Sequence, residues 1–170
     1  MSRRKRSRRR KPPRIHKRTA PGSLPGFVAG PEDAKPSRLQ VIKYSGTEFT
    51  EKSLASVDEI RDFLDQQGVT WVNVDGLGDA ETFNKLCGIF ELHSLAMEDV
   101  VNTHQRAKME AYEGHLFIVL RMVSLNERLK SEQVSIFLGR NYVLTIQEWA
   151  GDSHDPVRKR LRESRGKLRT

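Results

Sequence analysis

Two adjacent acidic residues, Glu98 and Asp99, are the side chains of this sequence whose type and position best suit the binding of a metal ion. They fall within a short predicted helix over residues 94–101. Neighbouring helical residues point about 100° apart, so the pair cannot enclose an ion, but both carboxylates can offer oxygen ligands along one surface. Mg²⁺ accepts a few such ligands and keeps several waters. A solvated helix face is the commoner explanation of two adjacent acids, and the residues alone leave both interpretations open.

The sequence lacks the residue patterns of the common enzyme sites. The glycines of residues 76–78 have neither the spacing nor the lysine of a phosphate-binding loop, and no Gly-x-Ser-x-Gly segment marks a hydrolase nucleophile. Cys87 lies on the apolar face of a predicted helix and is expected in the core. As the only cysteine, it excludes an internal disulfide and a multi-cysteine zinc site. For His93 and His104, which flank the helix over 94–101, surface or capping roles are expected. We therefore do not expect an enzyme.

The net charge of +8 is unevenly distributed along the chain. Residues 1–18 hold eleven Lys or Arg and no acid, and residues 158–170 hold seven against one acid. The stretch between them holds twelve basic and twenty-one acidic residues. The protein is therefore an acidic body with two basic ends, and its pI of 9.9 says little about the surface of the body.

Three parts follow from composition. Residues 1–37 are predicted to be a disordered Arg/Lys-rich tail and linker, because like charges repel and prolines and glycines break helices. Residues 38–152 form the predicted folded domain, and residues 153–170 form a helix that leads toward a further segment. The run over 3–18 favours nonspecific contact with nucleic acid or anionic lipid through counterion release. A polyanion-binding protein is therefore the alternative function.

Hydrophobic periodicity and turn residues predict a mixed α/β fold. A helix over 57–68 is expected to begin at a capping box, in which Ser56 and Glu59 each bond a backbone amide, and Asp155, followed by a proline, is expected to cap the last helix. The other predicted elements are strands at 39–44, 47–52 and 70–75, helices at 80–90 and 94–101, and four hairpin strands at 108–112, 115–125, 130–138 and 142–147. This order predicts a mixed sheet with helices on its faces.

Several blocks of sequence, in this order, resemble one known family. They are WVNVDGL at 71–77, HSLAMEDVVNTHQRAK at 93–108, LFIVLRM at 116–122, SEQVSIFL at 131–138, YVLTIQE at 142–148, and GD at 151–152 followed by DPVR at 155–158. Each block alone is weak, but the ordered set is specific. The most specific part is Glu98-Asp99 followed by His104-Gln105-Arg106. Together they are similar to the amino-terminal cytoplasmic domain of CorA, the bacterial magnesium and cobalt channel.

The resemblance implies a fold, a partner and a site. CorA proteins are homopentamers whose protomers carry an α/β/α cytoplasmic domain, a long stalk helix and two membrane helices. Mg²⁺ bound between neighbouring cytoplasmic domains holds the channel closed, and Co²⁺ is a further ion of the family. By the motif, Glu98 and Asp99 are carried over as regulatory metal ligands, opposite an acid of the neighbour's stalk. The implied location is the cytoplasmic side of the bacterial inner membrane.

The sequence also departs from the family pattern. It has no Gly-Met-Asn, and its longest unbroken apolar run, residues 116–120, is far shorter than the roughly 20 residues of a membrane helix. We therefore expect a sensor portion without stalk or membrane helices, unable to conduct ions and holding only part of the metal site. A zinc-transporting relative remains an alternative. Residues 104–106 are expected to pin the helix-to-strand junction, with a subunit contact or a contact near the metal as alternatives. Asp75 is expected to cap the end of its strand, or else to lie near the metal.

Overall fold

One mixed β-sheet forms the centre of the domain in the computed structural model, which describes residues 36–64, 67–125 and 129–169. The elements in chain order are β1 (Arg38–Tyr44), β2 (Phe49–Leu54), the 3₁₀ helix η1 (Val57–Phe63), β3 (Val69–Asp75), α1 (Ala80–Phe90), α2 (Ser94–Val101), β4 (Lys108–Tyr112), β5 (His115–Leu125), β6 (Leu129–Gly139), β7 (Tyr142–Gln147) and α3 (Asp155–Arg162). Nearly all of the predicted tail and linker lies outside the described residues.

The strand order across the sheet is β2-β1-β3-β7-β6-β5-β4. β3 and β7 run parallel in the centre, and every other neighbouring pair is antiparallel. After β3 the chain forms α1 and α2, begins again at the far edge with β4, and returns through hairpins to the centre with β7. This path places α2 directly before the edge strand β4, where the candidate metal ligands lie.

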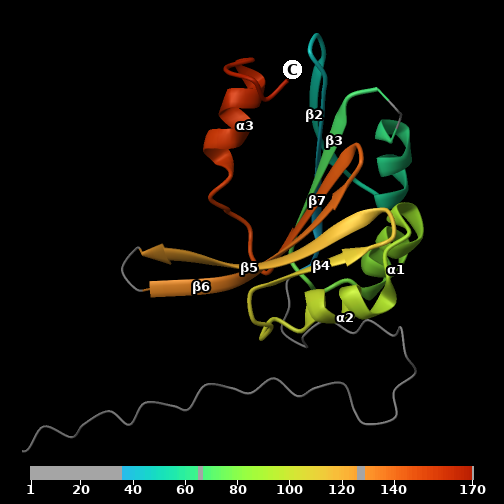
Figure 1. The fold of residues 1–170 in the computed structure, drawn as a ribbon, viewed down its shortest axis with the longest axis vertical. Helices are drawn as coiled ribbons and strands as arrows, with labels where there is room; N and C mark the ends of the chain where they lie inside the picture. The colour runs from blue at the N-terminus through green and yellow to red at the C-terminus, as the bar shows by residue number, and fades with distance from the viewer. Residues whose placement is uncertain (1–35, 65–66, 126–128, 170) are drawn as a thin grey trace, which may run out of the picture.

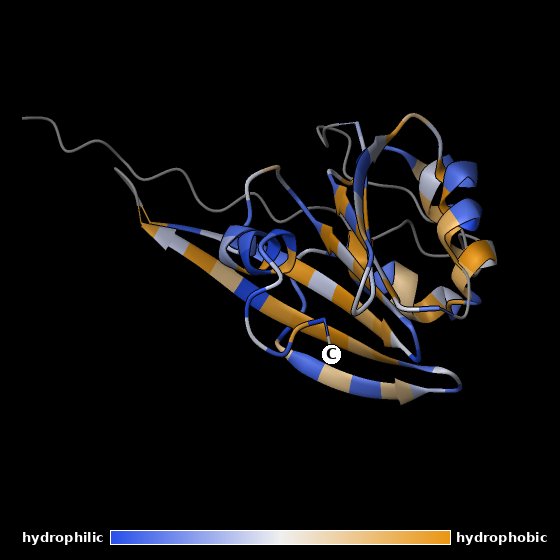
Figure 2. Cartoon of the chain, turned by 90° about the horizontal axis from the view of Figure 1, so that it is seen from above, coloured by the Kyte–Doolittle hydropathy of each residue, from blue (hydrophilic) through white to orange (hydrophobic). Residues whose placement is uncertain are grey.

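Helices cover both faces of the sheet (Figure 1). η1, α1 and α2 lie on one face, and α3 lies on the other. Alternate residues of the central strands pack with the apolar sides of the first group to form the main core, which includes Val72, Val74, Leu144, Ile146, Phe83 and Leu86. Figure 2 shows the corresponding alternation of hydrophobic and hydrophilic residues along the strands. The predicted α/β fold, with a mixed sheet between helical layers, is confirmed.

The contact between α3 and the sheet is small and centres on Trp71. A second core joins Ile42, Trp71 and Leu161. The guanidinium of Arg158 lies 4.9 Å from the centre of the Trp71 ring and donates from both terminal nitrogens to the two carboxylate oxygens of Asp152, at 2.5 and 2.6 Å. Burial raises the pKa of Asp152, but hydrogen bonds from His154 and Arg158 outweigh it, so its pKa lies well below the ordinary value.

Three predicted elements have different boundaries in the structure, among them the second strand, which is shifted from 47–52 to Phe49–Leu54. The helix expected over 57–68 is a short 3₁₀ helix that ends at Phe63, although the Ser56–Glu59 capping box that begins it is confirmed. The second strand starts at Phe49 instead of residue 47, because the hydroxyl of Ser45 accepts from the amides of residues 47 and 48 and holds a turn there. α3 begins at Asp155 itself, so the predicted cap is displaced by one residue, and the helix ends at Arg162 instead of extending to residue 170. Asp155 instead pairs with Arg158 at 3.1 Å.

The other predicted helices and strands agree with the structure to within one residue at each end. α1 is capped by Asp79, whose carboxylate accepts from the amides of Glu81 and Thr82. Within the described ranges, no helix is long and apolar enough to cross a membrane.

Candidate metal centre

The two candidate ligands lie on α2, which the sequence anchors at both ends. The ring nitrogen Nδ1 of His93 accepts from the amide of Leu95 at 3.2 Å and caps the start of the helix, which confirms the capping role expected of His93. The amide of Asn102 donates to the carbonyl of Glu98 at 3.0 Å where the helix ends. Ala96, Met97 and Val100 are buried against the sheet, so Glu98 and Asp99 are left on the partly exposed side.

The carboxylate of Asp99 has two side-chain donors. The amide Nε2 of Gln105 donates to Oδ1 at 2.7 Å, and the ammonium of Lys108 donates to Oδ2 at 2.6 Å. The side chain of Asp99 is 27% exposed and that of Lys108 is 26% exposed. Asp99 is therefore a half-buried carboxylate that already faces a cation, whereas Glu98 points to the adjacent side of the helix and is partly buried.

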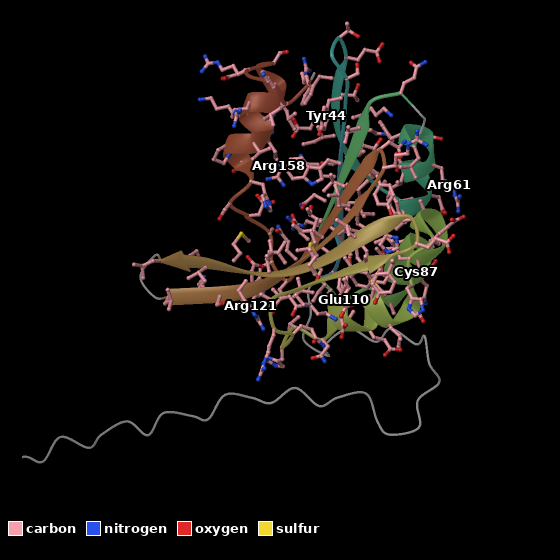
Figure 3. All side chains as sticks on the ribbon, in the orientation of Figure 1. Tyr44, Arg61, Cys87, Glu110, Arg121 and Arg158 are labelled. Atoms are coloured by element: carbon pink, nitrogen blue, oxygen red, sulfur yellow. The ribbon has the colours of Figure 1, made fainter. Side chains whose placement is uncertain are left out.

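A third acid, Glu110, completes the cluster on β4. Lys108 also donates to Oε1 of Glu110, at 2.8 Å, so its ammonium bridges two carboxylates, and the hydroxyl of Tyr112 donates to Oε2 at 3.1 Å. Figure 3 shows Glu110 beside α2, whereas Arg158 lies between α3 and the sheet. Sequence reasoning missed Glu110. The signal that could have found it is strand alternation, because residues 108, 110 and 112 share one face of β4.

The contacts within the cluster shift the pKa values of Lys108, Glu110 and Tyr112. Partial burial lowers the pKa of Lys108, but hydrogen bonds to Asp99 and Glu110 outweigh it and the net pKa is raised. The hydrogen bond from Lys108 lowers the pKa of Glu110. Burial and the hydrogen bond to Glu110 raise the pKa of Tyr112. At neutral pH, Lys108 is consequently an ammonium and Glu110 a carboxylate.

The junction between α2 and β4 is held from the sheet. Gln133 of β6 is 2% exposed. Its Nε2 donates to the carbonyl of Asp99 at 2.8 Å, and its Oε1 accepts from the amide of Gln105 at 3.2 Å. Arg121 of β5 donates to the carbonyls of Thr103 and Gln105, at 2.7 and 3.2 Å. The pinning role expected of residues 104–106 is confirmed for Gln105, while His104 and Arg106 are exposed.

The donor set fits a hard cation only in part. Asp99 and Glu110 offer oxygen atoms that converge on a single ammonium, and oxygen is the ligand that Mg²⁺ prefers. However, no group of three or more His, Cys, Asp or Glu side chains in the described part of the chain is arranged to hold a metal ion. An ion bound here would keep several waters or take ligands from another chain.

Asp75 does not belong to this cluster. It lies at the end of β3 on the α3 side of the sheet, together with Trp71, whereas Lys108 and Glu110 lie on the opposite face. Its Oδ1 accepts from the amides of Asn73 and Gln147, at 2.8 and 2.5 Å. The structure supports the strand-end role expected of Asp75. It contradicts a place for Asp75 beside the candidate metal ligands, because the sheet separates Asp75 from them.

Cys87 is half-buried on α1 and packs against the main core. Burial raises the pKa of its thiol, so the thiolate is disfavoured. The structural role expected of Cys87 is supported.

Comparisons with known proteins place these features in a family. The family described as "CorA-like Mg2+ transporter protein" matches residues 66–170. The cobalt/magnesium transport protein CorA of Thermotoga maritima is 40% identical over 134 residues, which are 77% of this chain and 38% of that protein. The chain therefore spans well under half the length of this curated relative.

Solved structures share the fold at low sequence identity. The soluble domain of CorA from Methanocaldococcus jannaschii is 16% identical, with a TM-score of 0.50 over 78% of this chain and 48% of that chain. The ZntB cytoplasmic domain from Vibrio parahaemolyticus is 9% identical, with a TM-score of 0.56 over 78% of this chain and 52% of that chain. These likenesses concern the fold alone. The match over more than half of the chain and the 40% identity to the Thermotoga protein show that this chain belongs to the CorA-like Mg²⁺ transporter family.

Proposed function

We propose that this chain is the cytoplasmic, cation-sensing domain of a CorA-type transporter of Mg²⁺ and Co²⁺. Family membership and the CorA-type fold support the proposal. The transporter is a homopentamer in the bacterial inner membrane. The domain lies on the cytoplasmic side of that membrane and regulates transport without catalysing a reaction. The Thermotoga relative, which is named as a transport protein, supports the role in transport. The pentamer, the membrane and the regulatory role are proposed from the motif resemblance.

Within this proposal, Glu98 and Asp99 are ligands of a regulatory Mg²⁺. The observation that carries the assignment is the placement of Asp99, whose half-buried carboxylate already faces a cation at 2.6 Å beside a second acid. A neighbouring subunit supplies the opposing ligand. With oxygen donors only, the site favours Mg²⁺ over Zn²⁺, which prefers nitrogen and sulfur ligands. Binding to one isolated chain is expected to be weak, because few carboxylates must compete with water for the ion.

A titration with Mn²⁺ as a paramagnetic probe tests the site. Amide signals of residues 98 and 99 in the ¹⁵N spectrum of the 170-residue chain should broaden, and Mg²⁺ should reverse the broadening. Glu98→Gln with Asp99→Asn should abolish the effect. The matched control is Asp58→Asn with Glu81→Gln, which removes the two acids around Lys85. Broadening that persists in the first variant would remove the site assignment.

The regulatory role needs a transport measurement. In a full-length transporter that carries this domain, withdrawal of cytoplasmic Mg²⁺ should increase ion flux through reconstituted liposomes. Glu98→Ala with Asp99→Ala should weaken this dependence on Mg²⁺. An unchanged dependence would contradict the sensing role while leaving membership of the family intact.

A second function is favoured by the basic run over residues 3–18, which belongs to a segment with eleven basic residues and no acid. This run contacts polyanions such as nucleic acid or anionic lipid through counterion release. Binding to RNA or to anionic vesicles should fall steeply with salt and disappear when residues 1–18 are removed. Tight binding that survives the deletion would place the interaction in the folded body instead.

A further inference from the structure

We infer that Lys108 is a built-in competitor of the regulatory cation: its ammonium holds Asp99 when no metal is bound and withdraws to Glu110 when a divalent cation takes Asp99. The inference rests on the proposed Mg²⁺ site and adds to it a residue that sets the cation concentration at which the site fills. The motivating contact is the bridge from one ammonium to two carboxylates, at 2.6 Å to Asp99 and 2.8 Å to Glu110.

The position of Lys108 is fixed by its strand. It is the first residue of β4 and lies opposite Val119 of β5. Its ammonium lies 5.5 Å from the centre of the Phe117 ring, a distance at which the ring face attracts a cation. The strand and the ring thus keep the ammonium within reach of Asp99. A metal that binds Asp99 must displace it, because like charges repel at such a distance.

Glu110 provides the second position for the ammonium. Its carboxylate is 41% exposed and accepts from both Lys108 and the hydroxyl of Tyr112. When the ammonium leaves Asp99, it keeps its contact with Glu110 and does not become an unpaired, partly buried charge. Displacement therefore breaks one ion pair and preserves the other. The two carboxylates accordingly have different roles: Asp99 exchanges cations, and Glu110 retains the lysine.

A double-mutant cycle read by the same Mn²⁺ titration tests this inference in the 170-residue chain. Lys108→Gln should lower the apparent Kd at Asp99 by about five- to tenfold, because a charge-assisted hydrogen bond no longer has to be broken. Lys108→Met should act in the same direction while keeping the aliphatic stem near Phe117. Glu110→Gln should raise the Kd in the wild-type background, because Lys108 then has only Asp99 to pair with. It should have no effect once Lys108 is Gln.

Lys85 offers the matched control. Its ammonium likewise bridges two carboxylates, those of Asp58 and Glu81, at 3.0 and 3.2 Å. Lys85→Gln removes the same charge at a different place and should leave the Kd at Asp99 unchanged. If both lysine variants lower the Kd equally, the effect is one of net charge and the inference is overturned.

The remaining outcomes separate the inference from the function it rests on. Equal Kd values for the wild type and Lys108→Gln, with clear broadening at Asp99, would overturn the competitor role and leave the Mg²⁺ site standing. A Glu110→Gln effect of the same size in both lysine backgrounds would show that Glu110 binds the ion itself and would overturn its role as the holder. Absence of broadening around Asp99 in every variant would contradict the proposed site and, with it, the inference.

Discussion

The buried side chain of Gln133 donates a hydrogen bond to the backbone carbonyl of Asp99 at 2.8 Å, which joins β6 to the end of α2. The same carboxamide accepts from the amide of Gln105 at 3.2 Å. One interior side chain therefore holds both the candidate ligand and the residue that donates to its carboxylate. The distance between Asp99 and the start of β4 is therefore set by a buried side chain as well as by the exposed contacts of Arg121.

Replacement of Gln133 by Leu should reduce the stability of the domain by about 1–3 kcal/mol. The substitution keeps the volume but leaves the carbonyl of Asp99 and the amide of Gln105 without a partner in a buried environment. Urea unfolding followed by circular dichroism measures the loss. Asn84→Ala, at an exposed position of α1, is the control and should change stability by less than about 0.5 kcal/mol. A Gln133→Leu variant as stable as this control would show that the hydrogen bonds of Gln133 do not stabilise the domain.

The ligand-bearing helix could be predicted from sequence, whereas the contacts around it could not. Local signals identified α2, its start at His93 and the pair at 98–99. Gln133 and Asp99 are 34 residues apart in sequence, so their contact depends on the order of strands across the sheet. That order is a property of the whole chain. Lys108 and Glu110 are near in sequence, but their pairing with Asp99 becomes visible only when α2 and β4 are placed together.

Errors at element boundaries had local physical causes. The sequence shows the capping box at Ser56, yet the apolar periodicity that follows it suits a long helix and a short 3₁₀ helix alike. For α3, the rule that an acid before proline caps a helix placed Asp155 outside the helix. In the structure Asp152 accepts from the amide of His154, and the helix begins one residue earlier than the rule expects.

The Asp152–Arg158 pair should dominate the attachment of α3 to the sheet. Asp152→Ala leaves a buried guanidinium without its carboxylate, and the expected loss is about 3–5 kcal/mol in unfolding free energy. The side chains of Arg158 and Asp152 are 6% and 1% exposed. Asp155→Ala removes a carboxylate that is 82% exposed and bonded to the same arginine, so it should have an effect below about 1 kcal/mol. Similar losses for the two variants, measured by urea unfolding, would contradict the dominant role of the buried pair.

Asp152 should also make the domain sensitive to acid. Its pKa is lowered in the folded state, so its contribution to stability is complete above the pKa of an unfolded aspartate, about 3.9. The contribution is lost as pH falls from there through the folded-state pKa. Between about pH 7 and pH 3, the wild type should lose more stability than Asp152→Asn, whose side chain does not titrate. Parallel pH profiles from urea unfolding would exclude Asp152 as a source of the acid sensitivity.

Two glycine-to-alanine substitutions should change stability in opposite directions. Gly68 has a φ of +78°, and a Cβ at this position would lie 2.3 Å from the backbone oxygen of Tyr44. The backbone on either side of this contact cannot move far, because Tyr44 of β1 and Thr70 of β3 are paired within the sheet. Gly68→Ala should therefore cost at least about 1–3 kcal/mol.

Gly88 lies in the last turn of α1, and a Cβ there would meet nothing within 4 Å. Gly88→Ala should stabilise the domain by about 0.5–1 kcal/mol, because alanine loses less backbone entropy in a helix. Thermal and urea unfolding of the two variants, each compared with the wild type, measure both signs. A Gly68→Ala variant as stable as the wild type would mean that the turn before β3 can adopt another conformation. A Gly88→Ala variant less stable than the wild type would mean that another surface packs against this side of α1.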